Sequence, residues 1–428
     1  MSRNLVLCAD GTCNAFGHSS SNVARLLKHV ELLNATEQLV CYDQGIGTRR
    51  SEYKSLERFK DGLGESGALE LLDPPDDAWG RPWTWPSLIK SMTEGAGLET
   101  NVAQLYEQLA TRYSPTDQVF LFGFSRGAFT VRALAGLTWR YGLPPSNDPS
   151  VARARFAEAW PLFVNEFPDD TGIKAERALR FRERHRQREC PIYFLGLWDT
   201  VKSYGGIRPV MLPHLRHNPS VEIVRHAMSL DECRAWFELT TWGWLDLDRG
   251  PDAAGSRLAQ SDREKISNRK DILEVWFSGC HADIGGGAGC ERSSEIAFRW
   301  MLAEAHHAGL SLNGQGRECL AVKREQERPI TNQSRTLFWK VIDNRIPRNA
   351  IRNDGVWPLL EEAKPGASPR QPLKSVRDKT IWYHESVQDL SRFEPVSGDV
   401  QLKVSETRRS PSAVATAEQS KTLVSKSQ

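Results

Sequence analysis

Short runs of consecutive apolar residues alternate along the chain with longer segments of helical or irregular pattern. The runs with strand character are residues 4–9, 38–42, 118–122, 191–197 and 272–277. Near-continuous apolar strands are typical of a parallel sheet that is covered on both faces. Residues 101–113 lie between the second and third runs and carry apolar side chains at helical spacing. The pattern therefore predicts a doubly wound α/β fold, with helices on both faces of a mostly parallel central sheet.

Each predicted strand is followed directly by polar residues and glycines. These segments are DGT (10–12), DQGIGT (43–48), GFSRG (123–127), DTV (199–201) and GCHADIGGG (279–287). The carboxyl ends of parallel strands meet at one edge of a sheet, and open α/β sheets bind their ligands at that edge. We therefore expect the functional site there.

The other segments are expected to be additions to one catalytic domain over residues 1–400. Insertions are expected at about 51–98, 142–190 and 202–270, the last two charged and mostly helical in pattern. The first contains Trp79, Trp83 and Trp85 among prolines and glycines, which fits a lid that docks on lipid or ordinary packing of a long loop. Residues 405–428 are rich in Ser, Thr and Lys, so the sequence predicts a disordered C-terminal tail.

The overall composition is that of a soluble, enzyme-sized protein. The 428 residues include 56 basic and 54 acidic side chains, so the net charge of +2 argues against a nucleic-acid partner. The eight cysteines form no C-x-x-C pair, and the N-terminus has no signal-peptide pattern. We therefore expect a cytoplasmic protein, or one exported without a signal peptide. Apolar runs all fall short of the ~18 residues of a spanning helix, so any membrane contact would be peripheral.

The strongest chemical signal is a serine between two glycines. Ser125 lies in the G-x-S-x-G sequence of residues 123–127, directly after an apolar strand and directly before the helix-like AFTVRALAG. A nucleophile elbow needs this context, because the turn is so tight that its flanking positions must be small. A serine nucleophile also needs a histidine base that is oriented by a carboxylate. The expected chain order is Ser, then acid, then His, and Asp199 and His281 follow later strands in that order.

Two other residues compete for the acid and base positions. Asp283 lies two residues after His281 and could orient the imidazole or shape its loop. Asp199 is favoured because it follows a strand directly. His226 is the rival base, but it begins a segment of helix-like pattern, where a histidine is more often structural.

Attack on an ester carbonyl creates an oxyanion, which needs preorganised donors. The backbone N–H of Arg126, the residue after the serine, is the expected first donor. The second is expected from the loop after the first strand, at the N–H of Gly11 or Thr12, with Asp10 as a supporting residue.

Other chemistries fit the sequence less well. Cys8 stands where an aspartyl-phosphate phosphatase has its nucleophilic aspartate, and no glycine-rich stretch has the lysine of a P-loop. The glycines after His281 would let its loop approach the serine. No cofactor is required, although a structural Mg²⁺ or Ca²⁺ could coexist with the serine site on the strand-end carboxylates Asp10, Asp43, Asp199 and Asp283.

Several stretches together resemble one protein family. They are LCADGTCN (7–14), YDQGIGT (42–48), LFGFSRGAFTVRALAG (121–136), LGLWDTV (195–201) and WFSGCHADIGGG (276–287). The resemblance is to the α/β-hydrolase domain family, formerly of unknown function, that includes the phospholipase effectors of bacterial type VI secretion. It covers most of residues 4–390, supported by RHAMSLDECRAWF (225–237), IAFRWMLAEAHHAGL (296–310) and WYHESV (382–387).

The resemblance implies an α/β-hydrolase fold and serine-dependent, phospholipase A-type hydrolysis of lipid esters. Carried over by motif, Ser125 is the nucleophile, Asp199 the acid and His281 the base. The resemblance also implies a secretion-system or immunity partner. The chain departs from the family at Cys13, where an aromatic residue is usual, and at residues 202–203, where Gly-Ser is common. A catalytically silent binding or secretion-associated module and a hydrolase of non-lipid esters remain alternatives.

Overall fold

The computed structural model describes the greater part of the predicted domain. The described residues are 2–11, 20–45, 50–72, 97–166, 172–201, 204–205, 208–209, 212–215, 218–232, 234, 237, 239–242, 271–287, 291–322, 380–387 and 401–405. The expected tryptophan lid, the Thr12 donor, the family departures at 13 and 202–203 and the predicted tail beyond Ser405 all lie outside the described residues.

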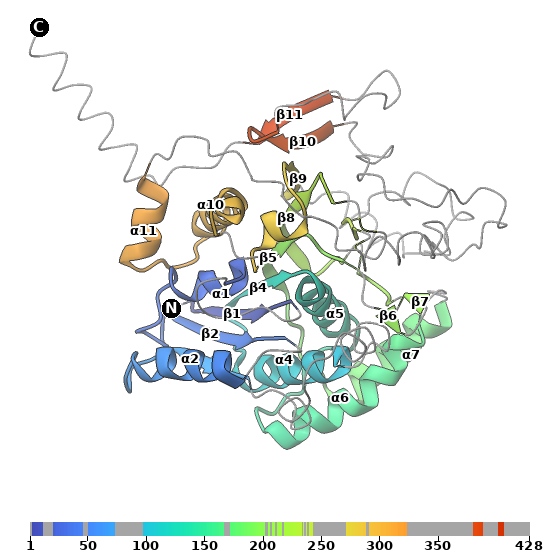
Figure 1. The fold of residues 1–428 in the computed structure, drawn as a ribbon. Coiled ribbons are helices and arrows are strands. Elements are labelled where there is room, and N and C mark those ends of the chain that lie inside the picture. The colour runs from blue at the N-terminus through green and yellow to red at the C-terminus, as the bar shows by residue number, and fades with distance from the viewer. Residues whose placement is uncertain are drawn as a thin grey trace, which may run out of the picture.

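Among the described residues, a nine-stranded sheet lies at the centre of the molecule (Figure 1). Its order is β11-β10-β9-β8-β5-β4-β1-β2-β3, and each neighbouring pair is parallel. The strands are β1 (Asn4–Ala9), β2 (Gln38–Asp43), β3 (Leu69–Leu71), β4 (Gln118–Phe124), β5 (Ile192–Trp198), β8 (Val221–Ser229), β9 (Ile272–Phe277), β10 (Thr380–His384) and β11 (Gln401–Ser405). A separate antiparallel ribbon pairs β6 (Tyr204–Gly205) with β7 (Arg208–Pro209).

The strand order reverses between β1 and β4. From β1 the chain moves outward through β2 to β3, and from β4 it moves the opposite way through β5 and β8. Such a reversal is the topological switch point of an open α/β sheet, where a crevice forms beyond the carboxyl ends of the strands. The predicted GFSRG turn follows β4 at this switch point.

Helices cover both faces of the sheet. One core contains side chains of α4 (Leu98–Arg112), α5 (Arg126–Tyr141), α6 (Pro149–Val164) and α7 (Gly172–His185). The other core contains side chains of α1 (Asn22–Leu27), α2 (Arg50–Asp61), α10 (Glu291–His307) and α11 (Gly314–Ala321). Strand β1 shows why its sequence is continuously apolar: Leu5 and Leu7 face the first core, and Val6 and Cys8 face the second.

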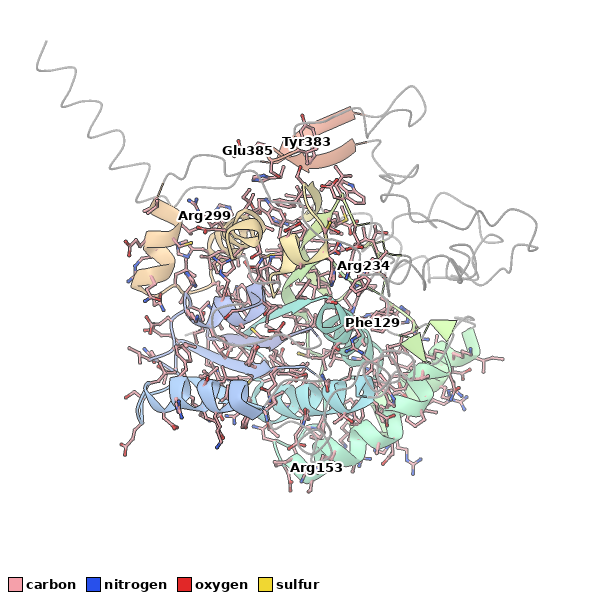
Figure 2. The ribbon with its side chains drawn as sticks, viewed as in Figure 1. Phe129, Arg153, Arg234, Arg299, Tyr383 and Glu385 are labelled. Atoms are coloured by element: carbon pink, nitrogen blue, oxygen red, sulfur yellow. The ribbon has the colours of Figure 1, made fainter. Side chains whose placement is uncertain are left out.

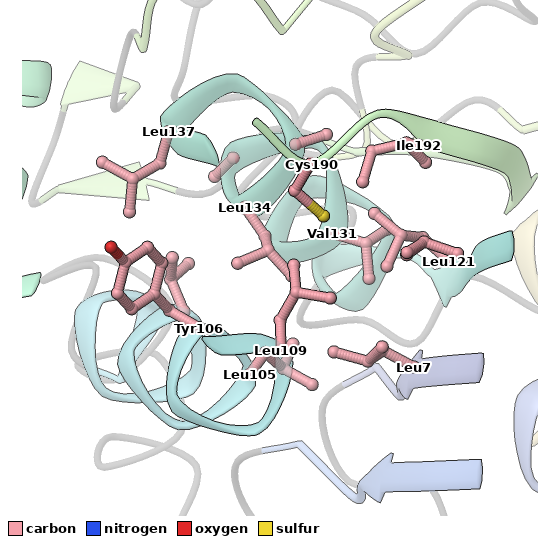
Figure 3. Packing of buried hydrophobic residues seen from close by; sticks show 14 of the residues in the cluster. Leu7, Leu105, Tyr106, Leu109, Leu121, Val131, Leu134, Leu137, Cys190 and Ile192 are labelled. Atoms are coloured by element: carbon pink, nitrogen blue, oxygen red, sulfur yellow. The ribbon is translucent and has the colours of Figure 1, made fainter. Parts of the chain in front are cut away.

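Helix α5 is held close to the sheet by packing. Leu105 and Leu109 of α4 meet Val131 and Leu134 of α5 beside the strand residues Leu7 and Leu121 (Figure 3). All six side chains are fully buried. This packing fixes the helix that begins immediately after Ser125.

The predicted α/β class and the five predicted strands are confirmed, each strand within two residues at either end. The helix predicted over 101–113 is α4. Residues 142–190 contain α6 and α7, which pack into the same core as α5. The sheet continues through Gln401–Ser405, just beyond the predicted end of the domain at residue 400.

The helical pattern expected over residues 202–270, and with it the helix-like segment at His226, is wrong for Val221–Ser229. That segment is β8, an interior strand between β5 and β9. Its buried polar residues have partners from distant parts of the chain: Arg225 pairs with Glu304 and Asp271, each at 2.5 Å. An interior strand that contains Arg and His lacks the apolar run by which the others were predicted.

The Arg225–Glu304 pair gives a test of this interior strand. Both side chains are almost fully buried, so Arg225→Met should lower the free energy of unfolding by about 3–5 kcal/mol, because it leaves the Glu304 carboxylate without its main partner. Arg225→Met combined with Glu304→Leu should recover most of that loss. Urea unfolding with an unchanged m-value measures both. The exposed pair Arg180–Glu176 is the control: Arg180→Met should cost less than about 1 kcal/mol.

Candidate active site

The turn around Ser125 has the strained backbone of a sharp strand-to-helix connection. Ser125 separates β4 from α5 and has φ 57° and ψ −120°. A Cβ on Gly123 would lie 2.6 Å from the backbone of Ala128, and one on Gly127 would lie 2.1 Å from the carbonyl oxygen of Ala9. Both flanking positions therefore require glycine. Backbone strain of this kind costs about 1–3 kcal/mol and persists only where packing enforces it.

Ser125, His281 and Asp199 form a continuous hydrogen-bond chain. The Ser125 Oγ lies 2.8 Å from the Nε2 of His281, and the Nδ1 of His281 lies 2.6 Å from the Oδ2 of Asp199. A carboxylate only accepts hydrogen bonds, so the proton belongs on Nδ1 and Nε2 accepts from the serine hydroxyl. This chain can move a proton from the serine to the imidazole and stabilise the resulting imidazolium.

Asp199 is fully buried at the end of β5 and is held from two sides. Its Oδ1 accepts the N–H of Ser229 at 2.9 Å, and its own N–H donates to the carbonyl of Ala227 at 2.8 Å. Its φ of 39° is in the left-handed region. The end of β8 thus positions the carboxylate that contacts His281.

His281 begins α9 (His281–Gly285) and lies between two aromatic rings. The ring centroids of Phe124 and Phe237 are 4.6 Å and 4.8 Å from that of the imidazole. Burial lowers the pKa of His281, and the hydrogen bond to Asp199 opposes this effect by raising it.

A side-chain cluster that the sequence patterns did not single out supports His281 from the other side. Glu232 accepts the backbone N–H of His281 at 3.2 Å and pairs with Arg234, whose guanidinium lies 3.7 Å above the ring of Phe237. In the view of Figure 2, Arg234 is labelled near Phe129, which lies close to the start of α5. The only available signal was the family-like stretch RHAMSLDECRAWF, which contains all three residues of the cluster.

The two rival residues have other partners. Asp283 accepts the backbone N–H of Cys280 at 2.8 Å and so caps its own short helix. The Nδ1 of His226 lies 2.8 Å from the Oε1 of Glu274, and its Nε2 accepts the N–H of Thr200 at 3.2 Å. The structure therefore brings Asp199 and His281 to Ser125, while Asp283 caps its own helix and His226 contacts Glu274 and the backbone of Thr200.

Two of the expected oxyanion donors, the N–H groups of Arg126 and Gly11, belong to the described residues. Arg126 is the first residue of α5, and the first N–H groups of a helix have no partner within the helix. The N–H of Gly11 donates to the Oδ1 of Asp10 at 2.7 Å. The Oδ2 of Asp10 accepts from the hydroxyls of Tyr42 and Ser21. Asp10 thus organises the loop after β1, and the Gly11 N–H already has an acceptor.

The strand-end carboxylates do not gather into a cation site in the part of the chain that the structure describes. No group of three or more His, Cys, Asp or Glu side chains there has the arrangement of a metal site. Asp199 and Asp283 accept the hydrogen bonds described above. Burial raises the pKa of Asp43 to about 6.

Within the described ranges, no helix is both long and apolar enough to cross a membrane.

Three comparisons place the chain among known proteins. The family model of the T6SS phospholipase effector Tle1-like catalytic domain matches residues 3–304. The Uncharacterized protein YEL023C of Saccharomyces cerevisiae is 30% identical over 242 residues, which are 55% of this chain and 32% of that protein. The chain thus spans about a third of the length of this curated relative.

A crystal structure of an uncharacterized protein from Pseudomonas aeruginosa is also similar. The match covers 74% of this chain and 47% of the other, with 20% sequence identity and a TM-score of 0.36.

The close contact at Gly127 gives a test of the turn. Gly127→Ala should destabilise the protein by about 3 kcal/mol, because the added Cβ meets the carbonyl oxygens of Ala9, the last residue of the central strand β1, and of Asp10, which follows it. Gly314→Ala is the matched control, since its Cβ would meet nothing within 4 Å, and should be neutral or stabilising by up to about 1 kcal/mol. Equal unfolding midpoints for the two variants would contradict this account of the turn.

Proposed function

Because the chain belongs to the family of T6SS phospholipase effectors with a Tle1-like catalytic domain, we propose that it is a serine hydrolase that cleaves carboxylic esters of phospholipid or other lipids. The observation that carries the proposal is the buried hydrogen-bond chain from Ser125 through His281 to Asp199, with links of 2.8 Å and 2.6 Å. The position of the serine on a sharp turn at the switch point of the sheet supports the same chemistry.

In the proposed reaction, the Ser125 Oγ attacks the ester carbonyl carbon while the Nε2 of His281 takes the hydroxyl proton. Asp199 stabilises the imidazolium and holds its ring in place. Collapse of the tetrahedral intermediate breaks the carbonyl carbon–oxygen bond, and His281 returns the proton to the departing alcohol. Water then attacks the acyl-enzyme by the same route and releases the carboxylic acid.

The oxyanion of the intermediate would be stabilised by backbone donors. The N–H of Arg126 is the first. The second would come from the loop after β1, at Thr12 or at Gly11. Gly11 can serve only by exchanging its present bond to the Asp10 carboxylate for one to the substrate.

The biological setting follows by family analogy. The substrate would be presented by a membrane that the protein contacts peripherally, after export through type VI secretion. A secretion-system component or an immunity protein would be its protein partner.

Active-site labelling tests the central residue. A fluorophosphonate probe should label the wild type at Ser125 and leave folded Ser125→Ala unlabelled. In Ser125→Ala, fatty-acid release from phosphatidylcholine vesicles should fall by at least ~10⁴-fold. Ser114→Ala changes a serine that precedes β4, at the opposite edge of the sheet, and should behave as the wild type. Persistent labelling of Ser125→Ala would refute the assignment. Hydrolysis of short-chain or acyl-sugar esters without release from vesicles would favour a non-lipid ester as substrate.

The pH dependence of kcat/KM tests the base. His281 acts as a base only when neutral, so activity should fall as the pH drops through its pKa. Burial is the larger influence and lowers that pKa, so the midpoint of the acid limb should lie below the ordinary histidine value of about 6.5. Asp199→Asn removes the influence that raises the pKa, and should move the limb to still lower pH while kcat falls by roughly 10⁴-fold. A wild-type midpoint clearly above about 6.5 would contradict the assignment.

A further inference from the structure

A second histidine–carboxylate pair, His226 and Glu274, contacts Thr200, the residue that follows Asp199. His226 on β8 is fully buried, and its Nδ1 lies 2.8 Å from the Oε1 of Glu274 on β9. Its Nε2 accepts the backbone N–H of Thr200 at 3.2 Å. His226 thus repeats the arrangement of His281: one ring nitrogen faces a carboxylate, and the other faces a hydrogen-bond donor.

These contacts require one tautomer of a neutral ring. The Glu274 carboxylate and the Thr200 N–H together require the proton of His226 on Nδ1 and the lone pair on Nε2. The charged groups that act on the ring are Glu274, Arg132 and Asp199, and burial lowers the pKa of His226. The ring therefore remains an acceptor for the Thr200 N–H at neutral pH.

The segment 239–242 connects the same residues to α5. The N–H of Thr240 donates to the carbonyl of Thr200 at 2.9 Å, and the N–H of Trp242 donates to the Oε1 of Glu274 at 2.7 Å. Arg132 of α5 donates to the carbonyls of Thr240 and Thr241 at 2.7 Å and 2.8 Å. Thr200 is thereby held through its N–H by His226 and through its carbonyl by Thr240.

Asp199 needs such support because of its conformation. Its backbone is in the left-handed region, a sparsely populated conformation that persists where the surrounding structure enforces it. We propose that His226, held by Glu274, is a positioning residue for Asp199: by accepting the Thr200 N–H it fixes the chain at the acid and so orients His281. The inference rests on the proposed function, because it assigns a role through the acid of that same site.

The test compares His226→Phe with His226→Gln in the full-length protein, with a soluble short-chain ester as substrate. Phe removes the acceptor, while the Gln side-chain oxygen can still accept from Thr200. For His226→Phe we expect kcat to fall by roughly 10- to 100-fold, because small displacements of catalytic groups have effects of this size, with KM changed by less than about twofold. His226→Gln should restore most of the loss. His384→Phe, in another buried histidine that stacks on Phe277, is the matched control and should leave kcat unchanged.

The pH profile separates positioning from a general loss of folded protein. Asp199 raises the pKa of His281, whose other charged neighbours are Arg234 and Glu232. A displaced Asp199 raises the pKa of His281 less, so the acid limb of kcat/KM in His226→Phe should move to lower pH. A lower plateau with an unmoved limb would overturn the inference, and so would equal effects of Phe and Gln or wild-type kinetics in folded His226→Phe.

Glu274→Leu keeps the test decisive if His226→Phe does not fold. The leucine removes the acceptor of the Nδ1 proton, so the His226 lone pair on Nε2 is no longer held toward the Thr200 N–H. The limb should again move to lower pH, and a folded Glu274→Leu variant with the wild-type profile would overturn the inference. Failure of the proposed function is distinguishable, since the wild type itself would then lack labelling at Ser125.

Discussion

Burial of the Asp199 carboxylate is the constraint on which the rest of the site depends. An isolated carboxylate loses several kcal/mol on leaving water, so a fully buried one must have partners arranged around it. Asp199 has the imidazole of His281 on one oxygen and the N–H of Ser229 on the other. Asp199 and these two partners come from three neighbouring strands of the sheet, β5, β8 and β9, or from the segments directly after them. The site therefore cannot form until β5, β8 and β9 lie side by side in register.

The same constraint explains the polar residues of β8. A strand that ends beside a buried carboxylate also contains Arg225 and His226, and each of these has an acidic partner from another element. Because each partner is remote in sequence, no local pattern shows that these residues are satisfied. This is why the apolar strands were predictable while β8 was assigned a helical pattern. The partners of Arg225 and His226 lie on other elements, so they become visible only in the folded chain.

The parts of the candidate site that could be predicted from the sequence are those where a short segment contains its own physical reason. The glycines around Ser125 follow from the tightness of one turn, and the order of Ser125, Asp199 and His281 follows from strands that end at one edge. The supporting residues Glu232, Arg234 and Phe237 were missed because they act on the backbone and ring of His281, and a sequence shows residue types and not the groups they contact. Asp283 accepts a hydrogen bond from within its own turn, which is the loop-shaping role considered for it from the sequence.

The glycines after His281 have a different reason from the one first considered. They were expected to let the loop approach Ser125. A Cβ on Gly285 would instead lie 1.8 Å from the ring of Phe124, and one on Gly286, whose φ is 83°, would lie 2.8 Å from the carbonyl oxygen of Ser20. Gly285 therefore leaves space for the aromatic ring that packs on the imidazole, and Gly286 lets α9 lie against the segment that precedes α1. The ring of Phe124 shields His281 from water, and this burial sets the balance between desolvation, which lowers the histidine pKa, and Asp199, which raises it. The glycines thus affect the basicity of His281 through the side chain for which they leave space.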